Sequence, residues 1–135
     1  MVVDTSALLA VAFLEPDFEP LEAALVVADR SVMSAATLLE ASMVMHARGK
    51  EAALKQLDEL LSDLAIDTVA VDSSQAFVAR DAFIRYGKGN HAAGLNFGDC
   101  FSYALAKTRD EPLLFKGDDF SQTDVAVAGP PAGWR

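Results

Sequence analysis

The sequence predicts an α/β fold in which a parallel β-sheet is covered by helices on both faces. Short apolar or β-branched runs alternate with longer stretches of helical periodicity along the chain. The first run, Met1–Asp4, is apolar up to its final acid, which is typical of a strand buried on both faces. A length of 135 residues suits one domain with one core. We expect residues 1–128 to form that domain, followed by a tail, residues 129–135, that is rich in Gly and Pro.

In the N-terminal half, apolar runs predict strands and helical periodicity predicts helices. The expected strands are Met1–Asp4 and Ser31–Met33. The expected helices are Thr5–Leu14, Phe18–Ala28 and Ala35–Ala47. Pro16 follows the end of the first helix, and Ser34 is a suitable N-cap for the third. Arg48–Lys50 is expected to be a loop because it contains Gly49.

The C-terminal half continues the alternation. The expected helices are Glu51–Leu64, which is strongly amphipathic, Ser74–Tyr86 and Phe97–Lys107. The expected strands are Ile66–Val71, Leu113–Phe115 and Val125–Val127. Functional residues of such sheets lie beyond the carboxyl ends of the strands. Asp4 and the Lys116–Asp119 loop are therefore expected at the same edge.

Composition excludes several classes of protein. No apolar run approaches the roughly 20 residues needed to cross a bilayer, and the N-terminal run lacks the basic leader of a signal peptide, so we expect no membrane partner. The single cysteine, Cys100, excludes an internal disulfide and multi-cysteine metal sites, and it suits a cytoplasmic protein. We expect Cys100 to be a small buried residue rather than a nucleophile.

The net charge of −9 argues against nucleic acid as a partner, since nucleic-acid binders usually carry a basic excess. Two features moderate this argument. Several acids are expected to share one metal site, where cations neutralise them. The charge is also unevenly distributed. Residues 80–91 contain one acidic residue, Asp81, and three basic residues, Arg80, Arg85 and Lys88, and end at His91. This stretch is a candidate phosphate-binding surface, although solvated surface charge is the simpler reading of each residue.

Four acidic positions are candidates for an active site: Asp4, Glu40, Asp99 and the pair Asp118-Asp119. Asp4 ends an apolar strand and Asp99 lies near a helix start, so each is alternatively a helix cap. The Asp118-Asp119 pair is alternatively an acidic turn.

Glu40 is the most informative of these acids. On a helix it falls among Leu39, Met43 and Val44, with no Lys or Arg three or four residues away. A carboxylate on an apolar face is costly to bury unless it is paired or bound to a metal. The alternative is that Glu40 lies at the rim of this face and reaches water.

As a group, the carboxylates predict a site for a divalent cation. Carboxylates gathered at one sheet edge raise one another's pKa, and a hard cation relieves their repulsion. Oxygen ligands, with one cysteine and two scattered histidines, favour Mg²⁺ or Mn²⁺ over zinc. Such a site suits hydrolysis of a phosphodiester bond by a metal-activated water.

Four segments of the chain also resemble a known family: Val3–Leu8, Leu39–Ala41, Gly94–Ala106 and Leu113–Phe120. In order and spacing they resemble PIN-domain ribonuclease toxins of the VapC type, over essentially the whole chain. The segment Gly98–Ala104 is the most specific. The resemblance implies a three-layer α/β/α sandwich with a central parallel sheet. It also implies a Mg²⁺-dependent endoribonuclease toxin that acts on RNA, often a structured RNA such as a tRNA, is neutralised by a VapB-type antitoxin and forms a homodimer.

The family's acids map onto the candidate site. Its three near-invariant acids fall on Asp4, Glu40 and Asp99, and its fourth on Asp118 or Asp119. Many relatives have Thr or Ser two residues before the fourth acid, a feature this chain lacks, so the choice stays open. We expect Asp4 and Asp99 to hold the metal directly, with Glu40 and the fourth acid completing the shell through waters or a second ion. The candidate substrate-binding residues are Thr5, Ser6, Arg80, Arg85 and Lys88.

Two alternatives belong to other functional classes. A regulatory receiver domain also carries an acidic cluster, and Asp72 after Ile66–Val71 would be its phosphoacceptor. A PIN fold that has lost catalysis would act only as a binding module.

Overall fold

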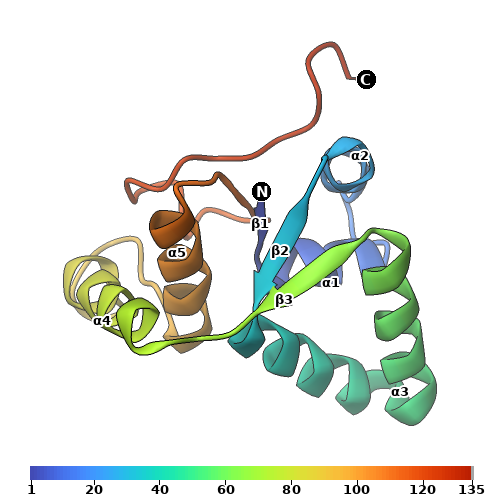
Figure 1. Cartoon of the computed structure of the whole chain (residues 1–135), viewed down its shortest axis with the longest axis horizontal. Coiled ribbons are helices and arrows are strands. Elements are labelled where there is room, and N and C mark those ends of the chain that lie inside the picture. The colour runs from blue at the N-terminus through green and yellow to red at the C-terminus, as the bar shows by residue number, and fades with distance from the viewer. Residues whose placement is uncertain (135) are drawn as a thin grey trace.

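The computed structural model describes residues 1–134, in which four strands and five helices alternate (Figure 1). The strands are β1 (Val2–Val3), β2 (Ser31–Ser34), β3 (Ile66–Val69) and β4 (Leu113–Leu114). The helices are α1 (Thr5–Ala12), α2 (Glu19–Val27), α3 (Ala35–Asp63), α4 (Ser73–Tyr86) and α5 (Phe97–Arg109). Arg135, the last residue of the expected tail, lies outside the described residues. Within residues 1–134, none of the helices is both long and apolar enough to cross a membrane.

The four strands form one parallel sheet in the order β3-β2-β1-β4. Val2 of β1 pairs with Val32 on one side and with Leu113 on the other, so the N-terminal strand is central. All four carboxyl ends therefore meet at one edge, where the chain continues into Asp4 after β1 and into the Lys116–Asp119 loop after β4. The predicted parallel sheet is confirmed.

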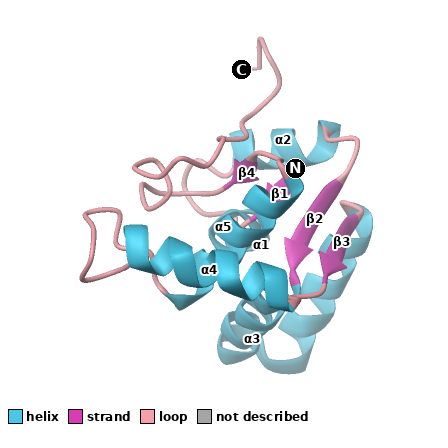
Figure 2. Ribbon diagram, turned by 60° about the vertical axis from the view of Figure 1, so that its left-hand side comes forward, coloured by secondary structure: helices cyan, strands magenta, loops and turns pink. Residues whose placement is uncertain are grey.

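Helices cover both faces of this sheet (Figure 2). Val2, Val32 and Leu113 pack in a core cluster with α4 and α5. The next residue of each of these strands packs in a second cluster with α1, α2 and α3. Successive side chains of a strand point to opposite faces, so a uniformly apolar strand serves two cores at once. The predicted three-layer α/β/α sandwich is confirmed.

The prediction of a strand at Val125–Val127 is wrong. This segment makes a single isolated parallel bridge, between Leu113 and Val127, on the outer side of β4. The backbone N–H of Leu113 donates to Ala126 O at 2.8 Å, and that of Ala128 donates to Leu113 O at 2.9 Å. Val125 is buried, whereas Val127 is 63% exposed. The apolar pattern alone does not reveal that pairing stops after one residue.

The predicted helices Ala35–Ala47 and Glu51–Leu64 form one helical element with a kink. Lys50 adopts φ 56° and ψ −141°, which interrupts α3 at a single residue. The break in the helix therefore lies within the expected loop Arg48–Lys50, but it involves Lys50 alone rather than three residues. The kink turns the second half of α3 back along the sheet (Figure 1).

Candidate active site

Asp4 follows β1 directly and is buried, with 3% of its surface exposed. Its Oδ2 accepts hydrogen bonds from the backbone N–H of Ser6 at 3.0 Å and from Ser6 Oγ at 2.7 Å. Its Oδ1 accepts a hydrogen bond from Ser102 Oγ at 2.6 Å. The bond from the Ser6 N–H makes Asp4 the N-cap of α1, as its sequence context allows. The cap does not account for Oδ1, which is held by a different helix, α5.

Ser6 connects Asp4 to the loop after β4. Its Oγ accepts a hydrogen bond from the backbone N–H of Lys116 at 3.0 Å. Since the single hydroxyl hydrogen of Ser6 goes to Asp4, this bond fills a lone pair of the same oxygen. The structure therefore brings Asp4 and the start of the Lys116–Asp119 loop together at the carboxyl edge of the sheet.

Asp99 lies in the first turn of α5, where a capping box fixes it. Its backbone N–H donates to Asn96 Oδ1 at 2.9 Å, and its Oδ2 accepts from the backbone N–H of Asn96 at 3.0 Å. The pKa of Asp99 is raised to about 7, chiefly by burial and also by the charges of Asp4 and Asp119, against the lowering effect of the Asn96 N–H. A nearby cation would therefore stabilise the ionised form of the buried Asp99 carboxyl.

Glu40 faces the same helix start from α3. Its Oε1 accepts a hydrogen bond from Thr5 Oγ1 at 2.5 Å. The carboxylate lies against Gly98, where an added Cβ would be 2.3 Å from Oε2. Leu39 and Met43, which flank Glu40 on the helix, are exposed. The hydrogen-bond partner of the Glu40 carboxylate is therefore the Thr5 hydroxyl, and Glu40 lies at the rim of the apolar helix face.

Of the two candidates for the fourth acidic position, Asp119 is the one that acts on Asp99. Asp119 lies close enough to Asp99 to hydrogen-bond with it and to raise its pKa. Both residues are exposed in the same turn, where the backbone carbonyl of Asp118 accepts hydrogen bonds from Ser121, from N–H at 3.2 Å and from Oγ at 2.6 Å. Asp119, rather than Asp118, is thus the acid that raises the pKa of Asp99.

These carboxylates form an open cluster. Within residues 1–134, no three His, Cys, Asp or Glu side chains converge closely enough to form a preformed metal cage. Mg²⁺ does not require one, because it usually keeps several waters and is held by one or two carboxylates. The all-oxygen donor set and the raised pKa of Asp99 both fit a hard divalent cation at this edge.

The basic residues form a separate surface on α4 and the loop that follows it. Arg80 stacks on the Phe77 ring at 4.8 Å, and Arg85 forms ion pairs with Asp81 and Asp124, each at 3.7 Å. Lys88 is exposed in the loop. Among the described residues, no hydrogen bond or ion pair joins these three basic side chains to the acids of the candidate site. Thr5 and Ser6, in contrast, donate hydrogen bonds directly to those acids, to Glu40 and Asp4 respectively.

Ser102 is the residue of the cluster that the sequence patterns do not single out. It lies three residues after Asp99 on α5 and is fully buried. A serine on a buried helical face needs a hydrogen-bond partner, and that is the signal that points to it. Its partner, Asp4, is 98 positions away in the sequence, so the sequence does not identify the pair.

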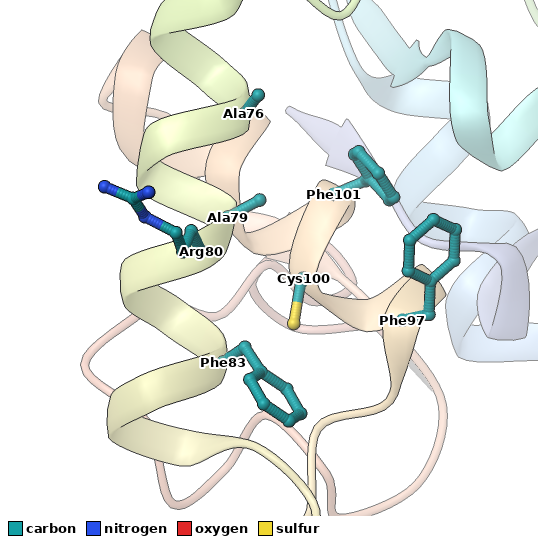
Figure 3. Close-up of a pocket in the computed structure, with 7 residues that line it drawn as sticks. All are labelled: Ala76, Ala79, Arg80, Phe83, Phe97, Cys100 and Phe101. Carbon is teal, nitrogen blue, oxygen red and sulfur yellow. The ribbon is translucent and has the colours of Figure 1, made fainter.

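Two other candidates have structural roles. Asp72 is the N-cap of α4, with Oδ1 accepting from the Gln75 N–H at 2.8 Å. Cys100 is buried, as expected, and burial raises the pKa of its thiol. Its sulfur lines a cavity of about 400 Å³ between α4 and α5, together with Phe83 and Phe97 (Figure 3).

Comparison with known proteins agrees with this architecture. Residues 1–126 match the model of the PIN domain. The chain is 51% identical over 131 residues to ribonuclease VapC30 of Mycobacterium tuberculosis, covering 97% of this chain and 100% of that protein. The crystal structure of M. tuberculosis VapC20, described as a sarcin-ricin loop cleaving toxin, superposes with a TM-score of 0.77 at 16% identity, over 96% of this chain and 98% of that one. A toxin–antitoxin complex from Klebsiella pneumoniae gives a TM-score of 0.70 at 19% identity, over 94% and 95%. The chain belongs to the PIN-domain family, among the VapC ribonucleases.

Proposed function

We propose that this protein is a Mg²⁺-dependent endoribonuclease and the toxin of a type II toxin–antitoxin system. The observation that carries the proposal is the buried carboxyl of Asp99, whose pKa is raised to about 7 beside Asp4 and Asp119 at the carboxyl edge of a PIN-domain sheet. A fold gains little stability from gathering like charges in a desolvated place, so the cluster favours a functional role. Family membership supports phosphodiester hydrolysis as that role.

Asp4 and Asp99 would hold the cation, because both are buried and both are fixed by hydrogen bonds. When bound, the cation supplies Lewis-acid stabilisation of the charge that develops on the phosphate in the transition state. Asp119 would join the same cluster from the loop after β4. This assignment makes Asp119 the fourth acid and leaves Asp118 as a turn residue.

Glu40 would orient the attacking water. Thr5 donates to Oε1 at 2.5 Å, which directs the carboxylate toward Gly98 and the start of α5. Oε2 then remains available to accept a hydrogen from a water molecule beside Asp99. Because Gly98 has no side chain, the Glu40 carboxylate approaches the backbone of α5 closely.

The substrate would be RNA, and structured RNA such as tRNA is the class to test first. Arg80, Arg85 and Lys88 would contact phosphates of the RNA backbone, since such contacts position a nucleic acid without reading its sequence. Because the protein as a whole carries a net charge of −9, the attraction for RNA must come from this basic surface alone. We therefore expect substrate affinity to fall with salt, with a slope set by these few contacts.

The antitoxin would dock in a groove lined by residues of α1, α2 and both halves of α3. It is lined by the apolar side chains of Val11, Met45 and Leu60 and by three carboxylates, those of Glu22, Glu59 and Asp63. A groove that combines apolar and acidic side chains complements a basic amphipathic helix. This surface therefore supports a VapB-type partner that inserts apolar anchors and places basic residues against the carboxylates. Charge reversal of Glu59 and Asp63 to Lys should weaken the complex with the antitoxin encoded nearby.

A homodimer would cover an exposed apolar surface around Phe97. Phe97 is 81% exposed, and its ring packs edge-on against Phe101 beside the α4–α5 cavity (Figure 3). The same two rings also line a second groove, together with Leu39 and Met43. Contiguous exposed apolar surface of this kind usually marks an interface. Sedimentation equilibrium should therefore give a dimer for the wild type and a monomer for Phe97→Asp. An unchanged mass for the variant would place the dimer elsewhere.

The activity is tested by incubating the purified protein with total RNA. Cleavage is expected with Mg²⁺, its loss with a chelator, and its loss in Asp4→Ala and Asp99→Ala. Cleavage by both variants at the wild-type rate would reject the proposed site. Circular dichroism of the variants checks that the loss is not a loss of fold.

A further inference from the structure

Ser102 and Thr37 form a buried pair of hydroxyl groups behind Asp4. Ser102 Oγ lies 2.6 Å from Asp4 Oδ1, and Thr37 Oγ1 lies 3.4 Å from Ser102 Oγ. Ser102 is fully buried and Thr37 is 1% exposed. The pair bridges three elements, because Asp4 follows β1, Thr37 lies on α3 and Ser102 lies on α5.

The hydrogens of this pair can be assigned from the acceptors. Asp4 is a carboxylate that only accepts, so the single hydroxyl hydrogen of Ser102 goes to Oδ1. Ser102 can then only accept from its neighbour, and Thr37 donates to it. The chain of hydrogen bonds therefore runs from Thr37 through Ser102 to Asp4, away from water. Bonds to a charged acceptor in such surroundings are stronger than neutral ones.

Ser102 also connects the Asp4 carboxylate to the helix that carries Asp99. Positions 99 and 102 lie three residues apart and hence on the same face of α5. One helix thus supplies the Asp99 carboxylate and the hydroxyl that holds Asp4, and any shift of α5 moves both. The other oxygen of Asp4 is tied to Ser6 and, through it, to the loop after β4.

We propose that Ser102, supported by Thr37, is a positioning residue that holds Asp4 Oδ1 at the spacing from Asp99 that a divalent cation requires. This inference rests on the proposed function, and it adds a role for two residues outside the acidic set. Outer-shell partners of ligating carboxylates typically change metal affinity by about 10–100-fold when removed. Ser102→Ala should therefore raise the dissociation constant for Mn²⁺ by about tenfold or more.

The experiment measures Mn²⁺ binding by electron paramagnetic resonance on the RNA-free protein, together with the rate of RNA cleavage. Ser31→Ala is the matched control, because Ser31 is also a buried serine but lies at the opposite end of β2 from the site. Ser31→Ala should bind Mn²⁺ as the wild type does. Urea unfolding of each variant reports its stability separately.

Thr37 provides a second, independent arm. Thr37→Val keeps the shape and removes the hydroxyl, whereas Thr37→Ser keeps the hydroxyl in a smaller side chain. The proposal predicts weaker Mn²⁺ binding for Thr37→Val, in the same direction as Ser102→Ala, and restoration in Thr37→Ser. This pair decides the matter if Ser102→Ala does not fold.

The outcomes separate this inference from the proposed function. Mn²⁺ affinity within twofold of the wild type in both Ser102→Ala and Thr37→Val, with binding abolished in Asp4→Ala, would overturn the positioning role and leave the site intact. Wild-type Mn²⁺ binding and RNA cleavage in Asp4→Ala and Asp99→Ala would instead reject the site itself.

Discussion

The Glu40 carboxylate lies against the backbone of Gly98, so closely that a Cβ at position 98 would be 2.3 Å from Oε2 and 2.7 Å from Oε1. The two residues come from different helices, α3 and α5, and Gly98 immediately precedes Asp99. Because position 98 has no side chain, the Glu40 carboxylate can lie directly against the backbone next to Asp99.

Gly98→Ala is therefore expected to reduce RNA cleavage by about tenfold or more while leaving the fold intact. The new methyl group displaces the end of a flexible, half-exposed side chain, which costs little stability. Alanine also favours a helix over glycine by up to about 1 kcal/mol. Cleavage rates and urea unfolding measure the two effects. Gly129→Ala is the control, since its Cβ would meet nothing within 4 Å; equal cleavage by Gly98→Ala and the control contradicts the argument.

The two acids of the loop after β4 are expected to differ in function. Both residues are exposed in the same turn, but Asp119 raises the pKa of Asp99 and Asp118 does not. Asp119→Asn should slow cleavage by about tenfold or more, on the scale of a lost ligand-shell partner, and Asp118→Asn should leave the rate unchanged. The two variants remove the same charge from adjacent positions, so general electrostatics cannot explain a difference. A larger effect of Asp118→Asn would reverse the assignment.

The pKa of Asp99 predicts how stability depends on pH in the metal-free protein. The folded-state pKa is about 7, above the ordinary value of 3.8, so the native state binds more protons between these values. Stability should therefore fall as pH rises from about 4 to 7. Asp99→Asn should flatten this decline and raise the stability at pH 8 by about 1 kcal/mol or more. Urea unfolding across this pH range, with a chelator present, provides the measurement, and an unchanged pH profile in Asp99→Asn contradicts it.

Tyr103 anchors the C-terminal segment beside α5. Its hydroxyl donates to Asp124 Oδ1 at 2.5 Å, and Lys107 Nζ lies 3.2 Å from Asp124 Oδ2. These two partners lower the pKa of Asp124, so this contribution to stability is present above the ordinary carboxyl pKa and is lost as pH falls through the lowered value. Tyr103→Phe should cost about 1 kcal/mol at pH 7 and speed amide exchange in the Asp124 segment. Wild-type exchange there would exclude the anchor.

Much of the fold follows from local signals in the sequence. Val2, Val3, Val32 and Met33 are apolar because each strand serves two cores, and this pattern identifies the buried parallel strands. Val125–Val127 has the same pattern but makes only one bridge, since pairing depends on what lies beside the segment rather than on its composition. The kink involves Lys50 alone, and the helix propensities of the residues locate it only to the segment Arg48–Lys50.

The site was predicted less evenly than the fold. Asp4, Glu40 and Asp99 can be singled out because each stands in an apolar context that an acid disturbs. The choice between Asp118 and Asp119 depends on how the loop turns, and adjacent identical residues carry no signal for that. Ser102 and Thr37 act through partners that are distant in the sequence, so only the folded chain shows them beside Asp4.

Isothermal titration of the metal-free protein with Mn²⁺ tests the central claim most directly. The wild type and Asp118→Asn should bind the ion with the same affinity, and the double variant Asp4→Asn/Asp99→Asn should show no binding, because it keeps the shape of the site and removes the two buried carboxylates. Equal Mn²⁺ affinity in the wild type and the folded double variant would contradict the account.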